Sequence, residues 1–269
     1  MTLRYKAYLI DLDGTIYKGK DRIPSAEKFI ERLQLEEIPF LFVTNNATKT
    51  PQEVADNLAN HYHITVLPDL VYTSGVATAD YIKEHITGQK AFVIGEKALK
   101  EQLQLAGYQV VDQDPDFIVQ ALDRELTYQK LEKATLAIRE GLPYIVTNGD
   151  TNMPTERGFV PGSGAITAFL RAATQTEPIM IGKPSPIIMQ GALDKLNHML
   201  QSNQEEATLL SKEDLVMVGD NYQTDILAGI DFGMDTLMVL TGFSTLDDIK
   251  GKEKQPTHVI TDLSQWSLR

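Results

Sequence analysis

The stretch AYLIDLDGT, residues 7–15, points to the fold class and contains the first candidate site. Its first four residues are apolar, and two aspartates and a glycine follow them directly. A short apolar run that stops at Asp and Gly is typical of a buried strand that enters a turn. Similar runs recur along the chain and alternate with longer amphipathic segments. This alternation predicts an α/β fold built on a mainly parallel sheet.

The predicted strands are the short apolar runs, at residues 7–10, 40–43, 70–72, 91–94, 117–119, 144–146, 179–181, 215–218, 237–240 and 258–260. Helical spacing is clearest after Pro24, where four apolar residues recur at i, i+3, i+4 and i+7, and the same spacing returns after Pro186. Proline suits the first turn of a helix, so we expect helices to begin near both prolines.

The composition is that of an ordinary soluble protein, with 42% hydrophobic and 23% charged residues among 269. The net charge of −12 disfavours a broad contact with nucleic acid and favours small ligands. The chain has no cysteine, which excludes disulfides and thiolate catalysis. No apolar run approaches the roughly 18 residues of a membrane span, and the first residues do not resemble a signal peptide. We therefore expect a cytoplasmic protein without a membrane partner.

Four of the apolar runs end in residues that can carry chemistry. These ends are Asp11-Leu12-Asp13-Gly14, Thr44-Asn45-Asn46, Gly182-Lys183-Pro184 and Gly219-Asp220-Asn221. Ligands of open α/β sheets bind outside the carboxyl ends of the strands, so all four ends are expected to converge on one site.

The residue types at these ends fit phosphoryl transfer. Asp11, Asp13 and Asp220 supply the oxygen ligands that Mg²⁺ prefers, and the cation would separate an anionic carboxylate from an anionic phosphate. Lys183 and Thr44 can hold the remaining phosphate oxygens. A carboxylate can attack phosphorus, while a second one protonates the leaving oxygen and later activates water. Asp11 is the better candidate for the nucleophile and Asp13 for the acid and base, with the Asp13 carbonyl also available to the metal.

The strings DLDGT (11–15), TNN (44–46), GKP (182–184) and GDNYQTD (219–225) resemble, in order, the four motifs of the haloacid dehalogenase-like phosphohydrolases. The pattern is most similar to the NagD-like sugar and nucleotide phosphatases and the p-nitrophenyl phosphatases. The resemblance implies Asp11 as nucleophile and Asp13 as acid and base. It implies a magnesium site at Asp11, Asp13 and Asp220, with Asp225 beside or on the metal. The expected phosphate-binding set is Gly14, Thr44, Asn45 and Lys183.

The resemblance also implies a Rossmann-like core with a smaller inserted α/β cap. We expect the core at residues 1–75 and 179–269 and the cap at 76–178, with a preference for small substrates over phosphoproteins. The glycine-rich segment 158–164 is expected to be a flexible return from cap to core that ends at a helix N-terminus. Candidate substrate contacts in the cap are Asp123, Arg124, Asn148, Asp150 and Arg157.

The sequence therefore predicts a magnesium-dependent phosphatase of small phosphorylated metabolites, such as sugar phosphates or nucleoside monophosphates, with p-nitrophenyl phosphate as a substrate in vitro. Two alternatives stay open: a phosphomutase or other phosphoryl transferase, and a non-catalytic regulatory module whose aspartate accepts phosphate. The core motifs do not identify the physiological substrate, because specificity depends on the shape of the substrate pocket. The sequence also leaves open whether the protein is a homo-oligomer.

Overall fold

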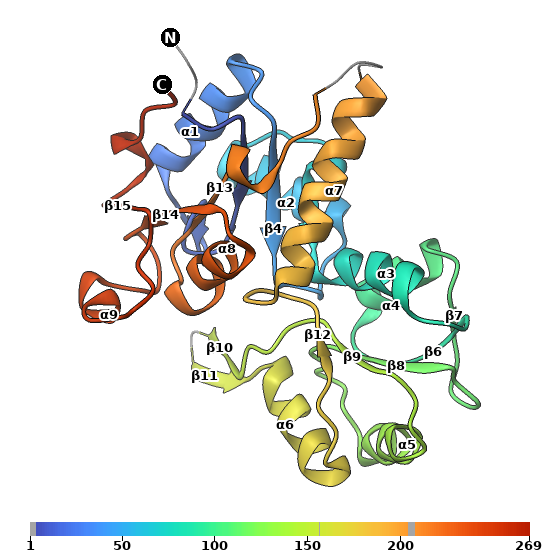
Figure 1. The fold of residues 1–269 in the computed structure, drawn as a ribbon. Coiled ribbons are helices and arrows are strands. Elements are labelled where there is room, and N and C mark those ends of the chain that lie inside the picture. The colour runs from blue at the N-terminus through green and yellow to red at the C-terminus, as the bar shows by residue number, and fades with distance from the viewer. Residues whose placement is uncertain (1–3, 156, 204–207) are drawn as a thin grey trace. The chain divides into compact units, whose positions relative to one another are not determined.

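The computed structural model describes residues 4–155, 157–203 and 208–269, which form two compact units (Figure 1). The first unit takes its residues from 1–44, 51–72 and 183–269, and the second from 45–50 and 73–182. These limits differ from the expected core (1–75 and 179–269) and cap (76–178), since the segments 45–50, 73–75 and 179–182 belong to the second unit. That the second unit acts as a cap stays a prediction.

The first unit is built on a six-stranded sheet with the order β15-β14-β13-β1-β4-β5. Its strands are β1 (Ala7–Ile10), β4 (Phe40–Thr44), β5 (Val71–Thr73), β13 (Leu215–Gly219), β14 (Asp235–Val239) and β15 (His258–Ile260). Strand β1 pairs in parallel with β13 on one side and with β4 on the other. All four residues of β1 are buried, which explains why the run is apolar throughout rather than alternating.

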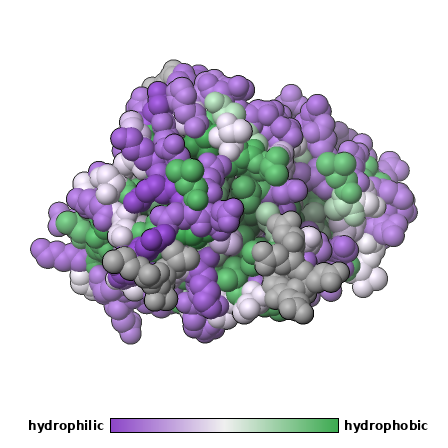
Figure 2. All heavy atoms as spheres, turned by 90° about the horizontal axis from the view of Figure 1, so that it is seen from above, coloured by the Kyte–Doolittle hydropathy of each residue, from purple (hydrophilic) through white to green (hydrophobic). Residues whose placement is uncertain are grey.

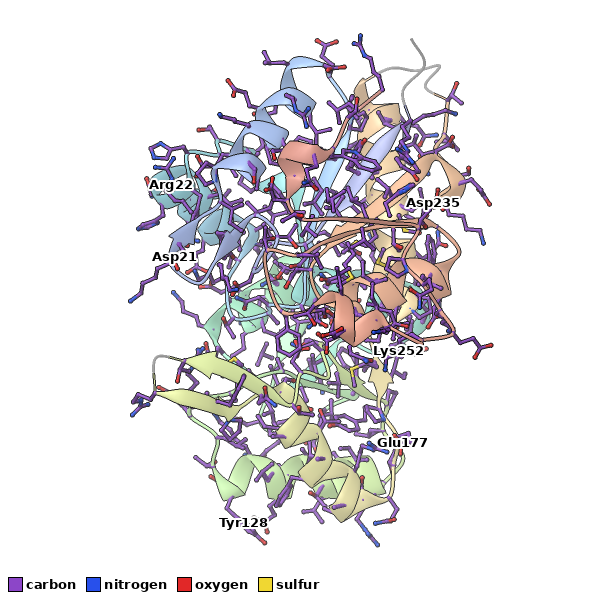
Figure 3. All side chains as sticks on the ribbon, turned by 90° about the vertical axis from the view of Figure 1, so that its left-hand side faces the viewer. Asp21, Arg22, Tyr128, Glu177, Asp235 and Lys252 are labelled. Carbon is purple, nitrogen blue, oxygen red and sulfur yellow. The ribbon has the colours of Figure 1, made fainter. Side chains whose placement is uncertain are left out.

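The helices of this unit are α1 (Pro24–Leu35), α2 (Pro51–Tyr62), α7 (Pro186–Asn203), α8 (Leu227–Phe232) and α9 (Leu246–Ile249). Helices α1 and α7 begin at or next to the two prolines that predicted them. The apolar face of α1 is buried, and the Phe29 ring meets the Tyr8 ring of β1 edge to face at 5.5 Å. A short hairpin of β2 (Tyr17–Lys18) and β3 (Asp21–Arg22) follows the first motif (Figure 3).

The second unit has its own parallel sheet, with the order β12-β9-β8-β6-β7. Its strands are β6 (Lys90–Ile94), β7 (Gln109–Val110), β8 (Phe117–Gln120), β9 (Tyr144–Val146) and β12 (Ile179–Met180), and its helices are α3 (Ser74–His85), α4 (Lys97–Leu105), α5 (Tyr128–Arg139) and α6 (Ser163–Thr174). Its core gathers residues of this sheet with Ala134 and Ile138 of α5 and Leu170 of α6.

The structure corrects the expectation for segment 158–164. Gly158–Pro161 forms strand β11, which pairs antiparallel with β10 (Asn152–Thr155), and α6 begins at Ser163. The helix start was predicted correctly, but the segment is a hairpin strand and α6 stays in the second unit, so it does not return the chain to the core. The glycines that suggested flexibility instead allow close backbone approach, because a Cβ at Gly162 would lie 2.3 Å from the Asp150 carbonyl oxygen.

The α/β prediction is confirmed, and each run that predicted a strand overlaps a strand. Hydrophilic residues predominate on the face drawn in Figure 2, as expected from the high net charge. No helix in the described ranges combines the length and the apolar character needed to cross a membrane.

Candidate active site

Two carboxylates of the candidate site stand at the ends of neighbouring strands in the first unit. Asp11 follows β1, and its backbone N–H continues the ladder by donating to the Val218 carbonyl at 2.9 Å. Asp220 follows β13, the strand that contains Val218. Thr44 ends β4 on the other side of β1. The parallel sheet therefore brings three of the predicted ends to one edge, although they come from distant parts of the chain.

The position of Lys183 in the fold differs from the one that the sequence suggested. The run before it, β12, belongs to the sheet of the second unit, so the expectation of four ends in a single sheet is wrong. Lys183 instead lies in the segment between β12 and α7 and counts with the first unit. Its side chain is 1% exposed, and its Nζ lies 2.6 Å from Asp11 Oδ1 and 2.8 Å from Asp225 Oδ1. The ammonium also donates to the Val43 carbonyl at 2.8 Å, next to Thr44.

Asp220 is 2% exposed and is held from two directions. The Phe243 N–H donates to Oδ2 at 2.6 Å, and the Thr15 hydroxyl donates to Oδ1 at 3.2 Å. Gly14 makes room for this carboxylate, because a Cβ at that position would lie 2.3 Å from Asp220 Oδ2. Its φ of +96° also favours glycine. Gly14 of the first motif thus lets the chain turn and leaves space for the Asp220 carboxylate of the fourth motif.

Asp225 belongs to a single π-helical turn, Tyr222–Ile226, that leads into α8. The Asn221 N–H donates to Oδ2 at 3.0 Å, and the Thr224 hydroxyl donates to Oδ1 at 3.2 Å. Single π turns of this kind are frequent at functional sites. Asp225 is buried and its contact with Lys183 joins the fourth motif to the third.

One carboxylate oxygen from each of Asp11, Asp220 and Asp225 lies within 4.8 Å of the other two. Burial, followed by repulsion from Asp225, raises the pKa of Asp11 well above its usual range and the pKa of Asp220 to about 7. Burial opposes the charge of Lys183, but attraction to Asp11 and Asp225 outweighs it and raises the lysine pKa. When all three carboxylates are ionised, the one ammonium leaves two negative charges uncompensated in a buried place. Oxygen ligands with that excess charge fit a hard divalent cation.

Asp13 differs from the three buried carboxylates because it is exposed. Its Oδ1 accepts a hydrogen bond from the Gly19 N–H of the β2–β3 hairpin at 3.1 Å. It is not one of the three clustered carboxylates, so its side chain is not part of the candidate metal cluster found among the described residues. Its role as acid and base stays a prediction, and exposure to solvent suits a group that must exchange protons.

The other predicted phosphate ligands divide between the two units. Thr44 is buried in the first unit, whereas Asn45 belongs to the second. The Asn45 carbonyl accepts hydrogen bonds from the Ser74 hydroxyl at 2.6 Å and from Asn148 Nδ2 at 2.9 Å. Their phosphate-binding roles, and that of Gly14, stay predictions.

The candidate substrate residues of the second unit contact other residues of that unit. Asp123 is buried and accepts from Lys130 Nζ at 2.8 Å, and Arg124 pairs with Glu96 at 2.7 Å. Asp150 Oδ2 accepts from Asn45 Nδ2 at 3.4 Å. Arg157 is exposed, and its backbone N–H donates to the Thr155 hydroxyl at 3.2 Å. A substrate contact for any of these residues, or for Asn148, stays a prediction.

The sequence interpretation missed the segment that follows β14. Thr241, Gly242 and Phe243 lie against the site, where the Phe243 N–H reaches Asp220 and the Thr241 hydroxyl donates to the Gly14 carbonyl at 2.6 Å. The available signal was the pattern already used four times, since the run at 237–240 also ends in a hydroxyl residue and a glycine.

Comparison with known proteins identifies the family of this chain. Residues 8–109 match the haloacid dehalogenase-like hydrolase family, and residues 180–266 match a second family described as HAD-hydrolase-like. An acid sugar phosphatase of Staphylococcus epidermidis is 48% identical over 97% of this chain and 96% of its own length. The chain belongs to the haloacid dehalogenase-like hydrolases.

Solved structures of other family members have the same fold over the whole chain. A mutant of the thermostable p-nitrophenylphosphatase from Bacillus stearothermophilus has a TM-score of 0.87 and 44% identity, and NagD from E. coli K-12 has a TM-score of 0.89 and 33% identity. Each match covers 100% of both chains. The predicted membership of this hydrolase family, in its NagD-like and p-nitrophenyl phosphatase branch, is confirmed, as is the prediction of a phosphatase.

Proposed function

We propose that this haloacid dehalogenase-like hydrolase removes phosphate from small metabolites, sugar phosphates above all, through an aspartyl-phosphate on Asp11 and with Mg²⁺ as cofactor. The observation that carries the proposal is the buried contact of Lys183 with both Asp11 and Asp225, beside a third carboxylate. The site contains a candidate nucleophile in Asp11, a buried ammonium in Lys183 and an excess of carboxylates, whose negative charge a metal ion would neutralise.

In the first step a carboxylate oxygen of Asp11 attacks the substrate phosphorus, and the bond from phosphorus to the ester oxygen breaks. Asp13 gives its proton to that oxygen, so the alcohol leaves neutral. Lys183 holds the nucleophile in place at 2.6 Å and offsets part of the negative charge that the phosphoryl group brings.

In the second step Asp13, now a carboxylate, takes a proton from water, and the oxygen of this water attacks the phosphorus. The bond between phosphorus and Asp11 breaks, which restores the Asp11 carboxylate and releases inorganic phosphate. One water is consumed and Asp13 ends protonated, as it began. The exposure of Asp13 supports this exchange with solvent and leaving group.

Asp11, Asp220 and Asp225 are the side chains that would hold a divalent cation, with the Asp13 carbonyl as a further predicted ligand. When bound, Mg²⁺ would neutralise the charge that develops on the transferring phosphoryl group. Asp225 also contacts Lys183, so we expect it to influence both the metal and the ammonium.

The substrate class rests on the relatives, which are named acid sugar phosphatases and p-nitrophenylphosphatases. We expect sugar phosphates as natural substrates and p-nitrophenyl phosphate as a convenient artificial one, with nucleoside monophosphates as a further class to screen. The second unit is proposed to act as a cap that restricts access to small molecules. A cytoplasmic location fits such metabolites and stays a prediction.

Replacement of the nucleophile tests the proposal. Asp11→Asn keeps the shape of the side chain but removes the anion, so kcat should fall below about a tenth of the wild-type value, a barrier change of more than about 1.4 kcal/mol. Circular dichroism and thermal unfolding of the variant provide the control for folding. A folded variant that retains more activity would exclude Asp11 as the nucleophile.

A phosphomutase would use the same aspartyl chemistry but return the phosphoryl group to a second hydroxyl of the sugar. Release of inorganic phosphate in step with substrate loss separates hydrolysis from transfer. A regulatory module would instead keep the aspartyl-phosphate for minutes without turnover.

A further inference from the structure

We infer that residues 241–244, which follow β14, form a positioning loop that fixes Asp220 and the turn of the first motif, and that this loop sets the affinity of the site for its divalent cation. The inference rests on the proposed function and deepens it. The loop lies outside the four motifs and contains no charged residue.

The loop contacts the Asp220 carboxylate directly. Its Phe243 N–H donates to Asp220 Oδ2 at 2.6 Å, and a Cβ at Gly242 would lie 1.9 Å from the same oxygen. Since a Cβ at Gly14 would also lie 2.3 Å away, the carboxylate is enclosed between two glycines. Real Cβ atoms do not come so close to a neighbour, so a side chain at Gly242 must displace either the loop or Asp220.

Further hydrogen bonds join the loop to the first and fourth motifs. The Thr241 hydroxyl donates to the Gly14 carbonyl at 2.6 Å. The Ser244 hydroxyl accepts from the Tyr222 N–H at 2.9 Å, and the Ser244 N–H donates to the Asp220 carbonyl at 3.2 Å. The loop therefore bonds to the turn after Asp11 and to the segment that contains Asp220.

Lys18 of the β2–β3 hairpin contacts the same loop. Its Nζ donates to the carbonyl oxygens of Thr241 and Gly242 at 3.3 Å each. These two bonds link the hairpin that follows Gly14 to the loop, so the loop spans three segments of the site.

Such contacts affect a metal site through the orientation of its ligands. Removal of a group that hydrogen-bonds to a metal ligand typically lowers metal affinity or activity by roughly 10- to 100-fold. Asp220 accepts one of its bonds from the backbone of the loop, and only the loop's conformation keeps that N–H in place. A change of loop conformation should therefore weaken cation binding even though every predicted ligand is still present.

The test measures Mg²⁺ binding to metal-free protein by calorimetry. Gly242→Ala should weaken binding by about 30-fold or more, and Thr241→Val, which removes only the hydroxyl, by about 10-fold. Thr241→Ser keeps the hydroxyl and should bind Mg²⁺ with nearly the wild-type affinity. The Mg²⁺ concentration that gives half-maximal activity should rise by a similar factor. In Thr241→Val, kcat at saturating Mg²⁺ should change less than this concentration does.

Thr261→Val is the matched control, because Thr261 is exposed and its backbone N–H and carbonyl, rather than its hydroxyl, form hydrogen bonds with Gln265 and Leu240. Thermal unfolding in EDTA separates a structural effect from a positioning effect. If Thr241→Val and Thr241→Ser bind Mg²⁺ equally well, or if Thr241→Val only lowers stability in EDTA, the inference is wrong. If wild-type protein itself does not bind Mg²⁺, the cofactor assignment of the proposed function fails instead.

Discussion

The Asp220 carboxyl group is buried beside Asp225, and these two causes raise its pKa to about 7 in the metal-free protein. An Asp in an unfolded chain has a pKa near 3.9. Between these two values the folded state binds a proton that the unfolded state lacks, so the contribution of Asp220 to stability falls as the pH rises. Above about pH 7 both states are ionised and the contribution no longer changes.

Asp220→Asn isolates this effect because the amide does not titrate. In EDTA, the free energy of unfolding of wild-type protein, relative to the variant, should fall from pH 5 to about pH 7 and then level off. Urea unfolding at each pH measures the difference. Mg²⁺ favours the ionised carboxylate and should remove this slope. A wild-type to variant difference that stays constant over the range would contradict the proposed environment of Asp220.

At the scale of single elements, the segment between β12 and α7 supplies the only ammonium that is paired with the carboxylate cluster in the described part of the chain. Removal of one member of a buried ion pair typically costs about 3–5 kcal/mol, because the partner charge stays buried. Lys183→Met should therefore destabilise the metal-free protein at pH 7.5 by roughly 3 kcal/mol, and it should also abolish turnover.

Lys28→Met on the exposed face of α1 is the matched control, since it removes a lysine without a buried partner. Urea unfolding in EDTA compares the two variants. Equal stability of both variants would show that the contacts of Lys183 with Asp11 and Asp225 do not stabilise the folded protein.

The same segment shows which elements the sequence could predict. The apolar runs predicted the strands because full burial requires apolar side chains on both faces. The run at 179–181 has this pattern too, but the pattern does not say which sheet a strand joins, and β12 joins the second one. The short strands β10 and β11 escaped prediction because each has only four residues and contains a proline, a residue that argues against a strand in a sequence pattern.

At the scale of the whole molecule, the candidate cation ligands come from distant parts of the sequence, so the cluster exists only in the folded chain. We expect activity to disappear in EDTA and to return with Mg²⁺. Ca²⁺ should restore it only weakly, because its larger radius and looser coordination misplace nucleophile and phosphate. Metal titrations of p-nitrophenyl phosphate hydrolysis check this, and full activity in metal-free buffer would contradict the cofactor assignment.

Ligand binding to the folded state also predicts that Mg²⁺ raises the unfolding temperature. The sequence predicted that Asp11, Asp220 and Lys183 converge, because charged residues at strand ends are conspicuous, whereas Asp225 was expected near the metal only from the family resemblance. It could not predict the ion pairs of Lys183 or the hydrogen bond from the Phe243 N–H to Asp220, since these depend on side-chain directions and backbone N–H groups that no residue pattern encodes.

The central claim is that Asp11 carries the phosphoryl group in a covalent intermediate and that Asp13 donates and accepts the protons of the reaction. Asp13→Asn tests both parts with p-nitrophenyl phosphate, whose phenolate can leave without a proton. The first step should survive in part, while the second lacks its base, so the phosphorylated enzyme should accumulate.

Rapid mixing of this variant with p-nitrophenyl phosphate, followed by acid quench and peptide mass spectrometry, measures the claim most directly. The account predicts a burst of nitrophenolate approaching one equivalent per site, slow turnover afterwards, and a phosphoryl group on the peptide that contains Asp11. Magnesium binding by the variant, measured beforehand, shows that its metal site is intact. Linear turnover at a near-wild-type rate, with no phosphoryl group on that peptide, would contradict the account.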